Sequence, residues 1–261
     1  MNTKIQKITF LGTGTSHGIP VIACDCAVCA STDPKDKRTR SSLLIELTNG
    51  KNILIDSSID LRQQCLTNKI RHVEAVLFTH CHADHVFGLD DMRLFNWLQK
   101  EDIVCHASSE HCEELRRIFA YAFGGAVQQG GGLPQLDLRP IAGTFKVYGL
   151  PVIPFEVKHG ISKVTAFRFE NIAYITDCSF IPEENYELLK GLDILVLDAL
   201  RHRKHPTHFN LEEAIAVARR IGAKQTYFTH IAHELGHEET NAKLPENMQL
   251  AYDGLALQIG F

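Results

Sequence analysis

The sequence of 261 residues has no apolar run near the roughly 18 residues that a membrane-spanning helix needs. Its first residues, MNTKIQKITFLG, have neither a long apolar core nor a small-residue cleavage site, so we expect no secretion signal. Internal repeats, low-complexity tracts and linker-like stretches are also missing. These absences predict a soluble, cytoplasmic protein in which residues 1–261 form one domain, with no membrane partner.

The sequence also has little net charge, because 27 Lys and Arg against 31 Asp and Glu leave −4. A nucleic-acid partner is therefore not expected, although a local basic patch stays open as an alternative. Eight cysteines without a secretion signal are expected to stay reduced, and three of them cluster between Cys24 and Cys29. The 14 histidines are many for this length, and their placement is informative.

Short β-type runs alternate with helical patterns, which predicts an α/β fold. We expect strands at Lys7–Leu11, Leu43–Leu47, Asn52–Ile55, Ala75–Phe78, Val152–Val157, Ala166–Phe169, Ile172–Ile175, Ile194–Leu197 and Thr226–Phe228. Near the C-terminus, Asp253-Gly254 predicts a tight hairpin turn between Met248–Tyr252 and Leu255–Ile259.

The clearest helix pattern is Leu211–Ile221, with Asn210 and Glu213 as a capping box and Gly222 as its end. Shorter helices are expected at Leu61–Thr67, Gly88–Gln99, Ser109–Ala122 and Glu183–Leu189. The glycine-rich segment Gly124–Gly132 predicts a loop, either a surface excursion or a lid over a substrate.

Four potential metal ligands, His80, His82, Asp84 and His85, follow directly after the predicted strand Ala75–Phe78. A loop that leaves a strand end can turn such side chains inward together. Ligands one residue apart, followed by an Asp-His pair, can serve two neighbouring cations. The alternative is a polar loop that is rich in histidine by chance, but packing does not require this density of ligand types.

Three further candidates occupy the same position relative to predicted strands. His159 follows one strand, Asp177 follows a second and His230 follows a third. Each one alone is more typical of a surface residue or of a histidine that is satisfied in the core. Because strand ends converge in a layered sheet protein, together they predict the shells of a two-metal site.

Cys24, Cys26 and Cys29 offer three thiolates in a short loop, whereas a closed zinc site has four ligands. His233, three residues after His230, is the best candidate for the fourth. A reactive thiol is the alternative interpretation. The remaining cysteines are expected to be small buried hydrophobes: Cys65, Cys81, Cys105, Cys112 and Cys178.

The order of these residues resembles the metallo-β-lactamase superfamily of binuclear hydrolases, over nearly the whole chain. The resemblance implies an αββα sandwich, two mixed sheets flanked by helices, with two divalent metal ions at one edge. It implies that His80, His82 and His159 hold the first metal, that Asp84, His85 and His230 hold the second, that Asp177 bridges them and that Asp56 is a buried supporting aspartate. Nitrogen and oxygen ligands permit Mn, Zn or Fe.

Gly12-Thr13-Gly14 before the cysteine loop, with His230 and His233 late in the chain, narrows the resemblance. This pattern is similar to the PhnP-like phosphodiesterases of the C-P lyase pathway, which hydrolyse 5-phosphoribosyl 1,2-cyclic phosphate. It implies one structural Zn at the cysteine loop. A related loop occurs in pyrroloquinoline quinone biosynthesis proteins, so the loop does not define the substrate. For the nearby His17 we favour a structural role.

The basic loop Arg201–His208 is either a solvated loop or an overhang above the metals. In the resembled phosphodiesterases a histidine at this place contacts the substrate phosphate, and His208 matches it. We therefore expect Asp177 and His208 to be catalytic, Arg201, Arg203 and Lys204 to attract anions, and the substrate to be a small cyclic or diester phosphate. The alternatives are a tRNA 3′-processing endonuclease and a thioester or lactone hydrolase. A homodimer is compatible with these features.

Overall fold

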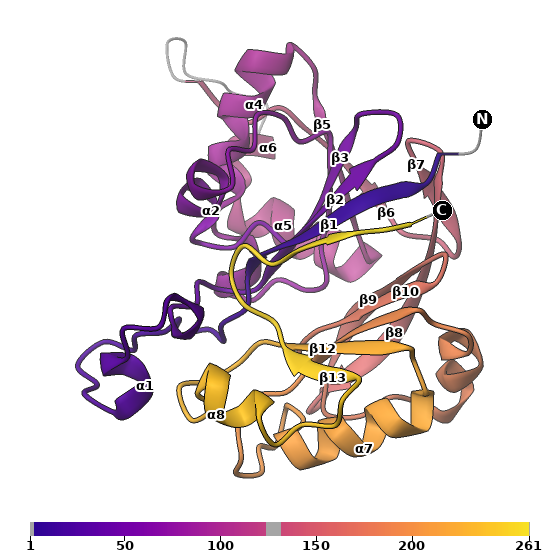
Figure 1. Cartoon of the computed structure of the whole chain (residues 1–261). Coiled ribbons are helices and arrows are strands. Elements are labelled where there is room, and N and C mark those ends of the chain that lie inside the picture. The colour runs from indigo at the N-terminus through magenta and orange to yellow at the C-terminus, as the bar shows by residue number, and fades with distance from the viewer. Residues whose placement is uncertain (1–2, 124–131, 261) are drawn as a thin grey trace.

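The computed structural model describes residues 3–123 and 132–260, and it consists of two stacked sheets with helices on both outer faces (Figure 1). The first sheet has the order β14-β1-β2-β3-β4-β5-β6 and the second has the order β13-β12-β11-β10-β9-β8-β7. Both are mixed, because the strands from β3 to β6 and from β10 to β13 are parallel neighbours and the others are antiparallel. This architecture confirms the predicted αββα sandwich.

The strands of the first sheet are β1 (Ile5–Gly12), β2 (Ser42–Leu47), β3 (Asn52–Ile55), β4 (Ala75–Leu77), β5 (Ile103–Ala107), β6 (Leu136–Pro140) and β14 (Ala256–Gln258). The strands of the second are β7 (Phe145–Val147), β8 (Leu150–His159), β9 (Ser162–Phe169), β10 (Ile172–Ile175), β11 (Ile194–Asp198), β12 (Gln225–Thr229) and β13 (Met248–Leu250). The α-helices are α1 (Ala27–Ala30), α2 (Leu61–Thr67), α3 (Ala83–Val86), α4 (Met92–Gln99), α5 (Ser109–Ile118), α6 (Ala120–Phe123), α7 (Leu211–Ile221) and α8 (His237–Asn241). Three short 3-10 helices are η1 (Pro34–Asp36), η2 (Leu89–Asp91) and η3 (Glu183–Leu189).

Alternation along the strands divides the core into three apolar layers. In β3, Ile53 and Ile55 face the layer between the sheets, whereas Leu54 faces the helices outside the first sheet. Phe167 and Tyr174 meet them from the second sheet, whose other face carries the layer under α7. Because both faces of these strands are buried, their sequences are continuous apolar runs.

All nine predicted strands are present, with β8 and β9 longer than predicted, and α2 and α7 have the predicted bounds. The capping box of α7 also forms as predicted, between Asn210 and Glu213. The predicted helix Gly88–Gln99 is divided into η2 and α4, the predicted helix Ser109–Ala122 into α5 and α6, and the helix at Glu183–Leu189 is of the 3-10 type. Apart from Gly132, the predicted loop Gly124–Gly132 lies outside the described residues.

The predicted hairpin around Asp253-Gly254 is wrong. β13 pairs with β12 in the second sheet, whereas β14 pairs with β1 in the first, so the turn connects the two sheets (Figure 1). The cause is the half-buried Asp253 carboxylate, which accepts hydrogen bonds from the backbone N–H and hydroxyl groups of Thr13 and Thr39 at 2.6–2.9 Å. Asp253 therefore ties the C-terminal segment to the loops of the first sheet.

Within residues 3–123 and 132–260, no helix has the length and hydropathy that a membrane-spanning helix needs.

Candidate metal centre

The predicted ligands meet at the edge of the sandwich where several strands end. His80 and His82 follow β4, Asp84 and His85 lie on α3, and His159 is the last residue of β8. Asp177 and His230 follow β10 and β12, and both have left-handed backbone conformations, with φ of 50° and 57°. A non-glycine residue seldom adopts this conformation, and here it turns both side chains toward the same centre.

The ligand atoms form two groups that share Asp177. In one group the ligand atoms of His80, His82, His159 and Asp177 all lie within 4.8 Å of one another, and in the other those of Asp84, His85 and His230 do so. Asp177 Oδ1 lies 3.2 Å from His85 Nε2, and Asp177 Oδ2 lies 3.4 Å from His230 Nε2 and 3.8 Å from His80 Nε2. One carboxylate therefore reaches both groups.

Hydrogen bonds behind the ligands fix the direction of the imidazole rings. Asp56 accepts hydrogen bonds from the backbone N–H and the hydroxyl of Thr79, and it lies 2.7 Å from His85 Nδ1. His159 Nδ1 donates to the carbonyl of Thr207 at 2.8 Å. These contacts leave Nε2 of both histidines for the centre, as is usual for metal-binding histidines.

The charges of the site favour ionised carboxylates. Burial opposes ionisation of Asp177, but the imidazoles of His230 and His85 hold its pKa well below the ordinary range. Burial likewise opposes protonation of His230, yet Asp177 and Asp84 beside it raise its pKa to about 9. Burial keeps the pKa of His80 well below its ordinary value. Ionised carboxylates beside imidazoles are the donors that divalent cations require.

Unpartnered atoms show that these residues fit metal ions. His85 Nε2 and His230 Nε2 are buried, and although carboxylate oxygens lie 3.2–3.6 Å away, neither atom forms a hydrogen bond of good geometry within the described part of the chain. A buried polar atom without a partner is costly, and a bound cation would provide one for each. Mixed imidazole and carboxylate donors suit zinc, manganese and iron.

The His208 side chain lies close to both groups of ligands. It is buried, its ring stacks on His230 with 4.7 Å between centroids, and its Nε2 is 4.0 Å from Asp177 Oδ2. Its Nδ1 lies 3.2 Å from Asp198 Oδ1, and Asp198 Oδ2 accepts a hydrogen bond from the backbone of Phe209 at 3.1 Å. Asp198 is not among the predicted site residues, although it stands at a strand end just as the predicted ligands do.

The other basic side chains of this loop have structural partners. Arg201 donates to the carbonyls of Arg203 and Lys204, while Arg203 forms an ion pair with Glu234 at 2.8 Å. Lys204 lies 3.8 Å from Glu213, so all three cations expected to attract anions have partners within the protein. His17, in contrast, is exposed.

A cleft of about 490 Å³ opens in front of the first group of ligands. His80 and His82 form one side, and Glu110, His111 and Lys163 are among the residues that form the rest. A cleft of this size can hold a small-molecule substrate against the ligands.

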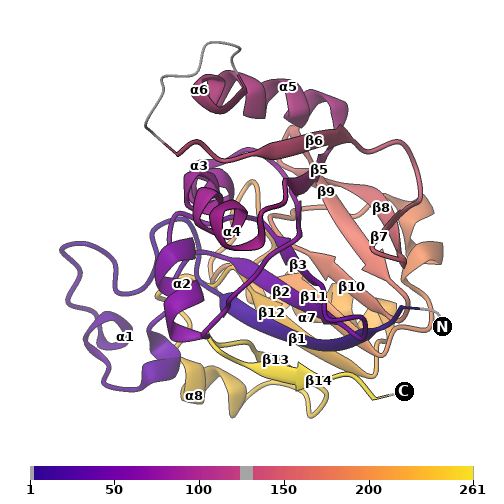
Figure 2. The same cartoon turned by 90° about the horizontal axis from the view of Figure 1, so that it is seen from above.

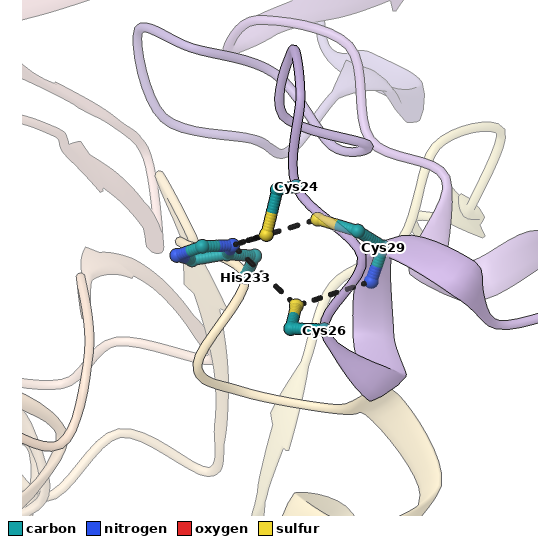
Figure 3. Close-up of side chains that lie close together, drawn as sticks. All are labelled: Cys24, Cys26, Cys29 and His233. Atoms are coloured by element: carbon teal, nitrogen blue, oxygen red, sulfur yellow. Dashed lines mark hydrogen bonds between the residues drawn. The ribbon is translucent and has the colours of Figure 1, made fainter.

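The three cysteines of the loop Cys24–Cys29 lie on one side of the His233 ring, with their sulfur atoms near its Nδ1 (Figure 3). Its Nδ1 lies 3.2 Å from Cys24 Sγ and 3.5 Å from both Cys26 Sγ and Cys29 Sγ. A hydrogen bond from the backbone of Cys29 lowers the pKa of Cys26, whereas burial raises that of Cys29 to about 11. Three thiolates and one imidazole form a donor set that structural zinc sites use.

The segment between His230 and His233 is held by the loop after β1, which separates the two histidines. Ile231 donates to the carbonyl of Thr13 and accepts from the backbone of Thr15, at 2.8 and 3.0 Å. His230 thus faces the two-group centre and His233 faces the cysteines. The five other cysteines are buried, as predicted.

Comparisons with known proteins agree with this geometry. A family model for a beta-lactamase superfamily domain matches residues 51–231. A crystal structure described as a new diphosphatase from the PhnP family is 41% identical, covers 98% of both chains and has a TM-score of 0.91. Zn²⁺-bound PqqB from Methylobacterium extorquens covers 97% of this chain and 100% of its own, with a TM-score of 0.78, but at 21% identity it shows the fold alone.

One sequence relative is longer than this chain. An octanoyltransferase of Porphyromonas gingivalis is 39% identical over 96% of this chain and 51% of its own length. This chain therefore spans about half the length of that relative.

Proposed function

Because the chain belongs to the beta-lactamase superfamily and is a metal-dependent hydrolase, we propose that it hydrolyses a phosphodiester bond in a small anionic substrate. The leading candidate is 5-phosphoribosyl 1,2-cyclic phosphate. The observation that carries the proposal is the position of Asp177, whose carboxylate lies 3.2 Å from His85 Nε2 and 3.4 Å from His230 Nε2 in one group and 3.8 Å from His80 Nε2 in the other. Two-metal sites of this kind stabilise both the attacking and the leaving oxygen of a displacement at phosphorus.

In this proposal the two groups hold one divalent cation each. His80, His82 and His159 bind the first, Asp84, His85 and His230 bind the second, and Asp177 contacts both. When bound, such cations activate water and polarise phosphoryl oxygens. The donor set permits Mn, Zn or Fe.

His208 is proposed to act on the substrate rather than on a cation. Asp198 lies at its Nδ1, so that Nε2 faces the same space as Asp177. From there Nε2 can donate a hydrogen bond to a phosphate oxygen or a proton to the leaving alkoxide. Asp198 orients the ring.

A third cation, a structural Zn, is proposed at Cys24, Cys26, Cys29 and His233. This Zn would hold the cysteine loop against the segment His230–His233. A closed site with four protein ligands has no open position for a substrate, so it supports the fold. We also propose that residues 1–261 form one hydrolase domain, which the apolar layer shared by both sheets supports. A cytoplasmic location stays a prediction.

A second candidate substrate class is a small diphosphate. The observation that favours it is the 41% identity with the diphosphatase of the PhnP family over 98% of both chains. Diphosphates and phosphodiesters present the same phosphoryl oxygens to the metals and differ in the leaving group. The test includes a third substrate class, an octanoyl thioester, because the Porphyromonas gingivalis relative is named an octanoyltransferase.

A substrate panel with metal-reconstituted protein tests the proposal. The panel contains bis(p-nitrophenyl) phosphate, 5-phosphoribosyl 1,2-cyclic phosphate, a nucleoside diphosphate sugar and octanoyl-coenzyme A, each also incubated with the Asp177→Ala variant. We expect turnover of one or both phosphodiesters, lost in the variant. Faster hydrolysis of the diphosphate would select the second candidate, and hydrolysis of the thioester alone would contradict the proposal.

A further inference from the structure

A groove leads away from the first group of ligands, between α5 and the hairpin of β8 and β9. Its inner part is the cleft of about 490 Å³, and a second cleft of about 430 Å³ adjoins it, because Glu110, His111 and Lys163 line both. One wall is the beginning of α5, which lies beside β6 at the edge of the first sheet (Figure 2). A substrate whose phosphate is held at the ligands therefore has room for an organic group in this groove.

The lining of the groove is acidic. Glu110, Glu114 and Glu156 line it, whereas Lys163 is the one lysine or arginine among the lining residues that the structure describes. Lys163 forms an ion pair with Glu156 at 2.9 Å, and Glu114 lies 3.5 Å from Arg117. Within residues 3–123 and 132–260, Glu110 has no ion-pair partner. Its exposed carboxylate is therefore available to a ligand.

The N-terminal end of α5 does not offset this negative charge. A helix N-terminus attracts anions, but Ser108 Oγ already accepts a hydrogen bond from the backbone N–H of His111 at 3.1 Å. Glu110 also lies in the first turn of α5, where its carboxylate is the anion that the helix end favours. A second phosphate in the groove would therefore be repelled by Glu110, and Lys163 is already paired.

An apolar side chain stands at the rim of the groove. Ile161 lies in the turn between β8 and β9 and is fully exposed, although it lines the cleft beside His80 and His82. Further along, the half-buried Ile141 and Pro154 line the second cleft. These side chains gain from contact with an apolar part of a ligand, because such contact removes their surface from water.

We propose that Glu110 and Ile161 select the organic group of the substrate. The carboxylate of Glu110 accepts hydrogen bonds from hydroxyl groups and repels a second phosphate, while Ile161 contacts an apolar part. This selection rests on the proposed function and narrows its substrate class to phosphodiesters of neutral alcohols that carry both hydroxyls and an apolar ring, as nucleosides do. 5-Phosphoribosyl 1,2-cyclic phosphate fits this selection only when its 5-phosphate lies outside the groove.

Three p-nitrophenyl diesters with the same leaving group test this selection in the metal-loaded protein. They are methyl p-nitrophenyl phosphate, p-nitrophenyl 5′-thymidylate and the 3′-phosphorylated form of that thymidylate. We expect kcat/KM to be about tenfold higher for the thymidylate than for the methyl ester, since only the thymidylate fills the groove and buries apolar surface there. The 3′-phosphate should lower kcat/KM by about tenfold, because its charge has the same sign as that of Glu110.

Glu110→Lys should reverse the preference against the 3′-phosphate, because the new ammonium group attracts it. Glu113→Lys is the matched control, since Glu113 is an exposed residue of the same helix that is not among the described lining residues, and it should keep the wild-type preference. Ile161→Ser should lower kcat/KM for the thymidylate by about fivefold relative to the methyl ester. Ile22→Ser should not, because Ile22 is 91% exposed but does not belong to the described lining of the groove.

A thymidylate no better than the methyl ester, a Glu110→Lys variant with the wild-type preference, or an Ile161→Ser variant with the full thymidylate advantage would overturn the proposed selection. In each of these cases the diesters are still hydrolysed, so the proposed function stands. No hydrolysis of any of the three diesters would contradict the proposed function, and the selection with it.

Discussion

The substitution His208→Ala separates chemistry at the leaving group from metal binding. The His208 ring stacks on His230 and its Nε2 faces Asp177, close enough to share a metal ion with them, but neither of the two proposed ligand sets includes it. We therefore expect the variant to fold and to bind all metals. Its turnover of phosphodiesters should fall by about 10²–10⁴, the usual contribution of a positioned acid or base.

A second variant gives the expected magnitude for orientation alone. Asp198→Asn keeps the shape of the side chain and an acceptor for His208 Nδ1, but it removes the negative charge 3.2 Å away. Residues behind a functional imidazole contribute about 10–100-fold, so this loss should be smaller than that of His208→Ala. The double variant should be worse than His208→Ala only by the part of the loss that acts through His230, whose Nδ1 lies 3.6 Å from Asp198 Oδ1.

The assay compares bis(p-nitrophenyl) phosphate, which has a good leaving group, with a cyclic diester whose leaving group is a poor alkoxide. If His208 donates the proton, His208→Ala should impair the cyclic diester far more than the activated one. Equal losses on both would assign His208 to phosphate binding. If the His208→Ala variant keeps its full metal content and loses no activity on either substrate, a catalytic role of His208 is refuted. The segment is then a solvated loop.

Three further predictions concern metals and stability. Asp177→Ala should abolish turnover and lower the content of both catalytic metals, measured by plasma mass spectrometry; full metal content would contradict the bridge. His233→Ala should lose one Zn and some thermal stability while the catalytic metals stay, and an unchanged Zn content would exclude the cysteine site. Burial lowers the pKa of His237 from 6.5 to about 4, so the unfolded chain binds a proton that the folded chain does not. The free energy of unfolding should therefore fall by about 2 kcal/mol from pH 7 to pH 5, and less in His237→Phe; denaturant titrations at both pH values that give equal falls would disprove this.

The sequence predicted the elements whose pattern is local and continuous. Leu211–Ile221 has a cap, an apolar face and a terminal glycine, and its observed bounds equal the predicted ones. Of the strands that were not predicted, Leu136–Pro140 is partly exposed and Ile103–Ala107 is mostly buried, and the pairing of both depends on neighbouring strands. Local pattern does not contain that information.

The hairpin predicted at Asp253-Gly254 is wrong for a similar reason. A dipeptide of this type between two apolar runs favours a hairpin when the runs pair with each other. Here the four hydrogen bonds from Thr13 and Thr39, residues far away in sequence, hold Asp253 between the two sheets. Long-range contacts of the half-buried Asp253 carboxylate outweigh the local preference of the turn.

The arrangement of strands explains why Asp198 was not identified although the ligands were. Ligands follow β4, β10 and β12, whereas the supporting carboxylates Asp56 and Asp198 come from β3 and β11, the parallel neighbours of those strands. Neighbouring parallel strands lie about 4.8 Å apart and end at the same edge, so each carboxylate stands one strand away from an imidazole. Asp56 thereby reaches His85, and Asp198 reaches both His208 and His230. An aspartate at a strand end is thus a ligand or a support according to which strand lies beside it, and only the sheet order decides between them.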